Sequence, residues 1–204
     1  MRLYHHPMSS NARRAVMTAV HLGTKVDLVL VDLAKSEQRK SEFLALNPNG
    51  RVPVLDDDGF ILSESHAIMQ YLADETPGQT VYPQERRARA DVNRWLFWSA
   101  HHFQPSISVL GFEHMVKGFR GLGAADPAMV KYGEGLVTTC ASVLDAHLAD
   151  KTWVAQDRLT LADLALAAPL MATLPAKLPV GSFANLQRWF AKVQELDAWK
   201  KTGV

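Results

Sequence analysis

The stretch "NPNGRVPVLDDDGFIL", residues 47–62, contains two short apolar runs on either side of Asp58-Gly59. An Asp-Gly pair between apolar runs is the strongest short-range signal for a β-hairpin. Pro53 opens the first run, although proline cannot donate a hydrogen bond to a sheet. A cis Val52–Pro53 bond would accommodate it and turn the Val52 amide and carbonyl outward, where an extended peptide can pair with them. An edge strand with a trans proline is the alternative.

The residues on both sides of this hairpin predict further strands and helices. Apolar runs predict strands, helical spacing of apolar side chains predicts helices, and Gly and Pro mark the ends. The predicted elements are a strand over 2–5, a helix from beyond Pro7 to Gly23, a buried strand over 26–33, a polar helix or helical turn over 36–46, and a helix over 64–75. The order with the hairpin is β-α-β-α-β-β-α.

The second half of the chain is predicted to be helical. A segment with two prolines and a glycine, residues 76–83, has the composition of a linker. Helices are predicted over 88–103, 128–148, 159–174 and 184–201, with an irregular connection over 111–127. The helix 159–174 is apolar on nearly every side and is therefore expected at the centre of its domain. We expect two domains, an α/β domain over 1–77 and an all-helical domain over 84–204.

Composition and charge exclude several classes of function. The 204 residues carry a formal net charge of +1 with acidic and basic residues mixed, unlike a nucleic-acid-binding surface. Cys140 is the only cysteine, so no intramolecular disulfide can form. The first residues lack a signal-peptide pattern, and Asp163 and Pro169 interrupt the longest apolar stretch. We therefore expect a cytoplasmic protein that binds neither nucleic acid nor membrane.

Two polar triplets lie where strands lead into helices. "SES", residues 63–65, precedes a predicted helix, whose N-terminus attracts carboxylates; Ser65 can add a donor and Glu64 can pair with an ammonium. "SSN", residues 9–11, lies at the first strand-to-helix turn, where a hydroxyl can donate to a thiolate and lower its pKa. Helix capping is the simpler explanation for each triplet alone.

The histidines and the cysteine are weaker candidates for chemistry. His101 and His102 are adjacent and do not share a helix face, and the pair at residues 5 and 6 alternates across a strand. We therefore predict no metal site. Cys140 lies on the apolar face of a predicted helix, where a buried small side chain is the better interpretation than a nucleophile.

Three motifs together resemble the cytosolic glutathione transferase family over essentially the whole chain. They are "NPNGRVPVL" (47–55), "LSESHAIMQYLA" (62–73) and "RLTLAD" (158–163). The resemblance is to bacterial members of a serine-using or beta-, nu- or theta-like class. It implies a thioredoxin-like domain followed by an all-helical domain, a role in detoxification, and a homodimer. Glutathione would be a substrate and no other cofactor is implied.

The resemblance also implies roles for individual residues. Val52 and cis Pro53 would hold the cysteinyl part of glutathione, and Glu64 and Ser65 the γ-glutamyl head. Arg51, with Lys35 or Asn49, would face the glycyl carboxylate. Ser9 is the first candidate for thiol activation, Ser10 the second, and Asn11 a helper. Thr160 and Asp163 would cap the central helix. An apolar second substrate would lie between the domains near Met8, Phe103, Ile107, Phe112 and Met115, although core packing is the better interpretation of Ile107.

The expected reaction is attack of the glutathione thiolate on an apolar electrophile. The same site would also suit a glutathione-dependent isomerase, dehalogenase or peroxidase. A non-catalytic binding module of this fold is a further alternative. Glu64, Ser65 and Pro53 argue against it, because a scaffold alone would not need them.

Overall fold

The computed structural model describes residues 1–203 and divides into two compact units. The first unit contains Met1–Tyr82 together with the end of the chain from Glu195, and the second contains Pro83–Gln194. In the first unit the elements are β1 (Arg2–His5), α1 (Ser10–Leu22), β2 (Asp27–Leu30), the 3-10 helix η1 (Glu37–Arg39), α2 (Ser41–Leu46), β3 (Val54–Asp57), β4 (Phe60–Ser63), α3 (Ser65–Asp74) and α10 (Asp197–Lys201). The predicted β-α-β-α-β-β-α order is confirmed.

The four strands form one mixed sheet in the order β2-β1-β3-β4. β1 runs parallel to β2 and antiparallel to β3, and β3 is antiparallel to β4. The turn between β3 and β4 places Asp58 at φ 49° and Gly59 at φ 94°. Positive φ at both central residues is what a two-residue hairpin turn needs, so the predicted hairpin is confirmed. The Val52–Pro53 peptide bond is cis, as expected.

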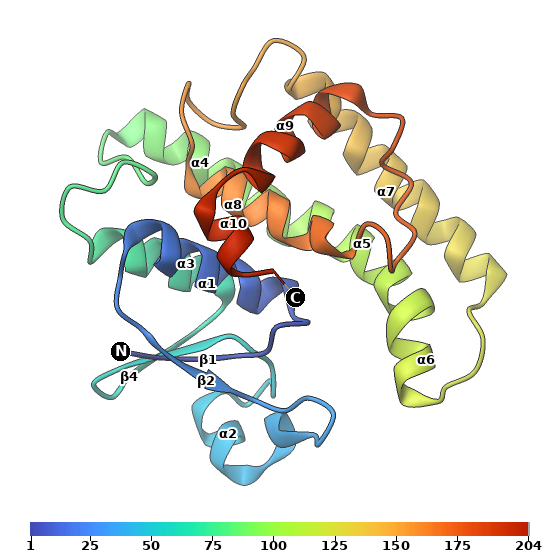
Figure 1. Cartoon of the computed structure of the whole chain (residues 1–204), viewed down its shortest axis with the longest axis horizontal. Coiled ribbons are helices and arrows are strands. Elements are labelled where there is room, and N and C mark those ends of the chain that lie inside the picture. Colours follow the sequence, from blue (N-terminus) through green and yellow to red (C-terminus); the bar gives the residue numbers. More distant parts are fainter. Residues whose placement is uncertain (204) are drawn as a thin grey trace. The chain divides into compact units, whose positions relative to one another are not determined.

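Helices lie on both faces of this sheet (Figure 1). α1 and α3 cover one face, where the apolar side chains of both helices meet those of β1 and β3. α2 lies on the other side, where Phe43 packs with Val52 and Val54. The core members on the α1–α3 side are Leu3, Ala15, Val16, Ala19, Leu55, Ile68 and Leu72.

The prediction of a buried strand over 26–33 is wrong in one respect. A strand forms there, but β2 is at the edge of the sheet and pairs only with β1 among the described strands. Leu28 and Leu30 are 48% and 59% exposed. Apolar runs of this kind usually belong to buried strands, and the pattern alone cannot show which strand takes the edge.

All secondary-structure elements of the second unit are helices, among the residues that the structure describes. Its elements are α4 (Arg86–Trp98), the π-helix η2 (Ser99–Phe103), α5 (Gln104–Gly111), the π-helix η3 (Phe112–Val116), α6 (Lys117–Arg120), α7 (Pro127–His147), α8 (Leu161–Ala167), the 3-10 helix η4 (Ala168–Ala172) and α9 (Ala184–Gln194). Val92, Trp95, Leu96 and Ser99 form one buried stripe, as their spacing predicts. Every residue of α8 is buried, which confirms the predicted central helix.

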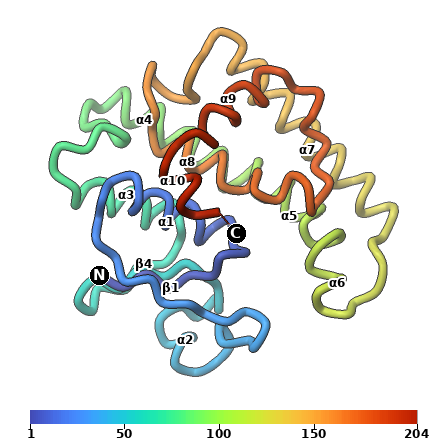
Figure 2. Tube along the Cα trace, viewed as in Figure 1, coloured from blue at the N-terminus to red at the C-terminus, as the bar shows by residue number. Residues whose placement is uncertain are grey.

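Two helix predictions in this half need correction. Residues 112–120 are helical rather than irregular, and the chain leaves the helix only at Gly121, which takes φ 65° as the C-cap. Glycines at 111 and 118 suggested a loop, but helical packing tolerates them. The helix predicted over 184–201 is two helices, α9 and α10. α10 packs beside α1 within the first unit, as the trace in Figure 2 shows.

The predicted cap of the central helix is present and fully buried. The Asp163 carboxylate accepts the backbone N–H of Thr160 at 2.9 Å, and both residues are 0% exposed. Its oxygens also accept the Val154 N–H and the Trp189 Nε1–H, each at 2.9 Å. These donors satisfy a buried carboxylate that would otherwise be costly. Over residues 1–203, no helix combines the length and hydropathy needed to cross a bilayer.

Candidate active site

Most of the predicted site residues belong to the first unit and emerge at one end of its sheet. Tyr4 near the end of β1 pairs with Val54 at the start of β3, and Val54 also pairs with Ser63 at the end of β4. Segment 9–11 follows β1, Val52 and Pro53 precede β3, and Glu64 follows β4. Parallel pairing of β1 with β2 brings the segment after Leu30 to the same end. The strand register therefore gathers four stretches that are far apart in sequence.

Ser9 is the N-cap of α1. Its backbone is extended, with φ −92° and ψ 112°, and its Oγ accepts the N–H of Ala12 at 3.2 Å. Capping is therefore one role of this hydroxyl, as the simpler interpretation held. A hydroxyl that accepts a hydrogen bond keeps its own hydrogen for donation. Ser9 is partly exposed, and Ser10 and Asn11 follow it in the first turn of α1 with similar exposure.

The loop before β3 is held by the side chain of Asn47. Its Nδ2 donates to the Arg51 carbonyl at 2.8 Å, and its Oδ1 accepts the Asn49 N–H at 3.1 Å. Asn47 is 4% exposed, so the loop is fixed from inside. The Val52 side chain is also buried, and Val52 lies two residues before Val54, the first residue of β3 that pairs with the neighbouring strands. Its backbone thus lies beyond the sheet ladder.

Gly50 allows a close approach of this loop to η1. It has φ 60°, and a Cβ there would lie 2.8 Å from the Gln38 carbonyl oxygen and 2.9 Å from Arg39 Nη1. Any other residue would be strained and would clash with backbone. The same contact places the Arg39 guanidinium beside the loop that carries Asn49 and Arg51, a cation that the sequence analysis did not select.

Glu64 and Ser65 lie at the N-terminus of α3. Glu64 is exposed and adopts φ 69° and ψ 110°, an unusual conformation for a residue with a side chain. Such backbone strain concentrates at sites that hold ligands. Ser65 begins the helix and is 5% exposed. The pair thus presents a solvent-facing carboxylate next to a helix N-terminus that attracts anions.

Behind Ser65 lies a buried arginine from α1. Arg14 is 1% exposed, and its Nη1 lies 3.4 Å from the Ser65 Oγ. The same nitrogen lies 3.0 Å and 3.3 Å from the two ring nitrogens of His66. Burial lowers the pKa of the Arg14 guanidinium to about 9, so it remains charged at neutral pH. Arg13 and Arg14 are adjacent in the sequence, which does not show that one of them reaches α3.

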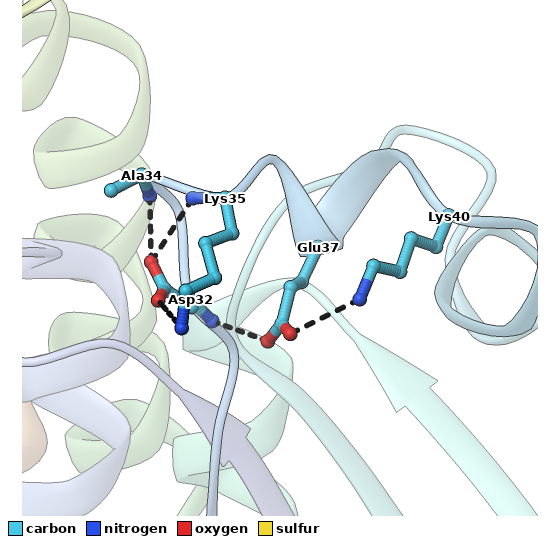
Figure 3. Close-up of polar contacts among 5 residues, drawn as sticks. All are labelled: Asp32, Ala34, Lys35, Glu37 and Lys40. Atoms are coloured by element: carbon cyan, nitrogen blue, oxygen red, sulfur yellow. Dashed lines mark hydrogen bonds and ion pairs between the residues drawn. The ribbon is translucent and has the colours of Figure 1, made fainter.

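Lys35 belongs to a polar network after β2 (Figure 3). The Asp32 carboxylate accepts the N–H groups of Ala34 and Lys35 at 2.9 and 3.1 Å, and pairs with Lys35 Nζ at 3.2 Å. Glu37 accepts the Asp32 N–H at 2.8 Å and pairs with Lys40 Nζ at 3.1 Å. The Lys35 side chain is 76% exposed. An exposed ion pair of this kind is weak, so Lys35 can exchange Asp32 for another anion at little cost.

The residues predicted to contact a second substrate differ in exposure. Met8 in the first unit is 55% exposed. In the second unit, Phe112 is 41% exposed and Met115 is partly exposed. Phe103 and Ile107 are 0% and 3% exposed. The structure thus places these last two in the core of the second unit, as expected for Ile107.

Three contributors to the site escaped the sequence analysis: Asn47, Arg39 and Arg14. Asn47 opens the motif 47–55, but nothing in the sequence shows that its side chain holds the loop. The polar stretch 36–46 gave no indication of which cation approaches the loop. Their roles depend on contacts between distant segments. No group of acidic, histidine or cysteine side chains within residues 1–203 is arranged to hold a metal ion.

The chain is similar to known proteins over nearly its whole length. The N-terminal domain of glutathione S-transferases matches residues 1–74 and the C-terminal domain matches residues 103–197. Glutathione S-transferase 3 of Zea mays is 34% identical over 208 residues, covering 99% of this chain and 92% of that protein. Glutathione S-transferase F10 of Arabidopsis thaliana is 30% identical over 200 residues, covering 96% and 93%.

Solved structures agree with these matches. Glutathione transferase F7 from Populus trichocarpa has a TM-score of 0.90 at 27% identity, covering 98% of this chain and 96% of that one. A delta-class glutathione transferase of Nilaparvata lugens has a TM-score of 0.86 at 30% identity, covering 99% and 92%. The TM-scores show that an α/β first half followed by a helical second half has the same fold as these structures. The chain belongs to the glutathione S-transferase family.

Proposed function

We propose that this glutathione transferase binds glutathione at the end of the sheet where β1, β3 and β4 meet α1 and α3, and ionises its thiol for attack on an apolar electrophile. The observation that carries the proposal is the strand register. It brings a hydroxyl, a stretch of backbone outside the sheet pairing and a carboxylate-serine pair to one end of the sheet. These groups suit the three chemically different parts of glutathione.

The γ-glutamyl head fits the start of α3. Its carboxylate would receive the Ser65 hydroxyl and the amides of the helix N-terminus, and its ammonium would pair with Glu64. The unusual backbone of Glu64 supports this assignment, because it keeps the carboxylate exposed beside the helix end.

The remainder of the tripeptide fits the loop that Asn47 holds. The cysteinyl part would pair with the Val52 backbone beside Pro53 as an added strand. The glycyl carboxylate would face Arg51, with Asn49 and Lys35 as further donors. The place of Arg39 beside Gly50 supports adding it to this group.

Ser9 would donate to the sulfur, with Ser10 second and Asn11 assisting. Lowering the thiol pKa by about two units needs about 2.7 kcal/mol of preference for the thiolate. One charge-assisted hydrogen bond and the N-terminus of α1 supply that order of energy. The thiolate then forms a bond to the electrophilic carbon, and the leaving group departs with its electron pair.

The remaining assignments are also proposals. Met8, Phe112 and Met115 would contact the electrophile. Phe103 and Ile107 are buried, so they would pack behind the residues that contact the electrophile. The homodimer follows from the family resemblance. The domain limits of 1–77 and 84–204 rest on the linker-like segment 76–83, and the cytoplasmic location rests on the composition. Phe97 is 65% exposed on α4, which fits a surface covered by a second chain. Sedimentation would show twice the single-chain mass of 22.6 kDa if the protein is a homodimer.

The test is a comparison of thiol substrates against an activated aryl halide. We expect turnover with glutathione and much less turnover with cysteinylglycine, which lacks the γ-glutamyl head. S-methylglutathione should inhibit competitively with glutathione. Equal rates with both thiols would contradict the assignment to Glu64 and Ser65. Binding of S-methylglutathione without turnover of aryl halides, haloalkanes, isomerisable substrates or peroxides would indicate a binding module instead.

A further inference from the structure

The buried guanidinium of Arg14 contacts the two residues that open α3. Arg14 is the fifth residue of α1, so it comes from the helix that Ser9 caps. Its Nη1 lies 3.4 Å from the Ser65 Oγ and about as close to both His66 ring nitrogens. α1 and α3 pack side by side on the same face of the sheet (Figure 1). One side chain thus connects the thiol end of the proposed site with its γ-glutamyl end.

Hydrogen-bond chemistry gives this contact a direction. A guanidinium has only donors, so the Ser65 oxygen must accept from Arg14. The Ser65 hydrogen is then turned away from Arg14 and is left to donate elsewhere. The nearby positive charge also polarises that O–H bond. For the same reason, the His66 nitrogen that accepts from Arg14 carries no proton.

We propose that Arg14 is a positioning residue for glutathione: it holds the Ser65 hydroxyl as a donor toward the γ-glutamyl carboxylate and supplies a fixed positive charge behind the first turn of α3. The proposal rests on the assignment of the γ-glutamyl head to Glu64 and Ser65. Arg14 does not touch the substrate in this arrangement. It acts through Ser65 and through the field at the helix end.

The neighbouring arginine provides a matched control. Arg13 is also buried, at 6% exposed, but faces the end of the chain instead. Its Nη2 donates to the Trp199 carbonyl at 3.1 Å, and its guanidinium lies 3.7 Å from the centre of the Trp199 ring. Replacing either arginine removes a buried charge from α1, but only Arg14 is connected to Ser65.

The experiment compares Arg14→Met, Arg14→Lys and Arg13→Met with two substrates. These are glutathione and its analogue in which the γ-glutamyl α-carboxylate is an amide. Methionine keeps the apolar packing of the arginine stem, and lysine restores the charge with one donor group. Assays use a saturating aryl halide and record KM and kcat separately.

In the wild-type protein we expect a higher KM for the amide analogue. Loss of a hydrogen bond to a charged group corresponds to about tenfold or more in affinity, so Arg14→Met should raise the glutathione KM about tenfold with little change in kcat. The KM of the amide analogue should change far less, so the ratio between the two KM values, which measures the preference for the carboxylate, becomes smaller. Arg14→Lys should retain much of the wild-type preference for the carboxylate. Arg13→Met should keep the wild-type preference.

Three results would decide against the proposal. If Arg14→Met changes only thermal stability and keeps the wild-type preference for the carboxylate, Arg14 is purely structural. If Arg14→Met does not fold, the change in glutathione KM caused by Arg14→Lys is measured twice, once with Ser65 present and once in a Ser65→Ala background. An equally large change in KM without the Ser65 hydroxyl would refute action through that hydroxyl. If the wild-type protein itself does not distinguish the two substrates, the γ-glutamyl assignment fails, and the role of Arg14 with it.

Discussion

Two replacements of Ser9 separate its role as a helix cap from its proposed role as a donor to the sulfur. Alanine and glycine differ as helix caps, but neither has a hydroxyl that can donate to a thiolate. Ser9→Ala and Ser9→Gly both remove the hydroxyl that accepts the Ala12 N–H. At an N-cap, alanine costs about 1 kcal/mol and glycine only a few tenths. For a chain of this size, about 1 kcal/mol corresponds to about 2–4 °C in Tm. Ser9→Ala should therefore lower the Tm measurably, and Ser9→Gly should lower it much less.

The effect on the thiol should be the same in both variants. A hydrogen bond to a charged group contributes about 1.5–3 kcal/mol, which corresponds to a rise of about 1–2 units in the pKa of bound glutathione once the hydroxyl is lost. The affinity for S-methylglutathione, which has no thiol to ionise, should change little. Near neutral pH the turnover should fall in proportion to the lost thiolate.

The assay is the ultraviolet absorbance of the thiolate, titrated with pH in the protein–glutathione complex, beside calorimetric unfolding of the free protein. Ser10→Ala is the control and should change the thiol pKa less than either Ser9 variant. An unchanged thiol pKa in both Ser9 variants would reduce Ser9 to a helix cap. A larger rise in Ser10→Ala would transfer the role to Ser10.

Three further substitutions, one of them with a matched control, test the surroundings of the site and the second unit. Asp163→Asn replaces one of two buried acceptor oxygens with a donor that faces N–H or O–H groups, so we expect about 2–4 kcal/mol lower stability in denaturant unfolding; an unchanged midpoint would contradict this. Gly50→Ala should raise the glutathione KM by displacing the loop from Gln38, whereas Gly59→Ala, where a Cβ meets no atom within 4 Å, should leave KM unchanged. The Lys117 ammonium and the Asp126 N–H lower the pKa of the Glu113 carboxyl, so its stabilisation is present above its ordinary pKa and is lost as pH falls through the lowered value. As pH falls below the ordinary pKa of a glutamate, Tm should therefore fall less steeply in Glu113→Gln than in the wild type, and equal slopes would exclude the contribution of Glu113.

Local chemistry in the sequence was enough to predict the strands and helices over residues 2–74 of the first unit. Asp58-Gly59 predicted the hairpin because few residue pairs accept positive φ twice in succession. Gly23 predicted the end of α1 for the same reason, and it takes φ 69° there. In the second unit, the family resemblance implied that Thr160 and Asp163 cap the central helix, and both halves of this capping box are present. Each of these features depends on residues within a few positions of one another.

The failures have a different origin. Leu28 and Leu30 suggested a buried strand, yet the position of a strand within a sheet depends on which other strands pair with it. The glycines at 111 and 118 suggested a loop, yet helical packing overrides their low propensity.

The candidate site shows the same division. The sequence identified Ser9, Val52 and Glu64 as chemically suitable, and the family resemblance gave them roles. Only the antiparallel register of β1, β3 and β4 brings them to one end of the sheet, because the pairing of β1 with β3 places Tyr4 opposite Val54, a residue far away in the sequence. Arg14 is the clearest case: in the sequence it is the second of two equivalent arginines. Folding directs one toward Trp199 and the other toward Ser65, since the side chains of adjacent helical residues point in different directions around the helix axis.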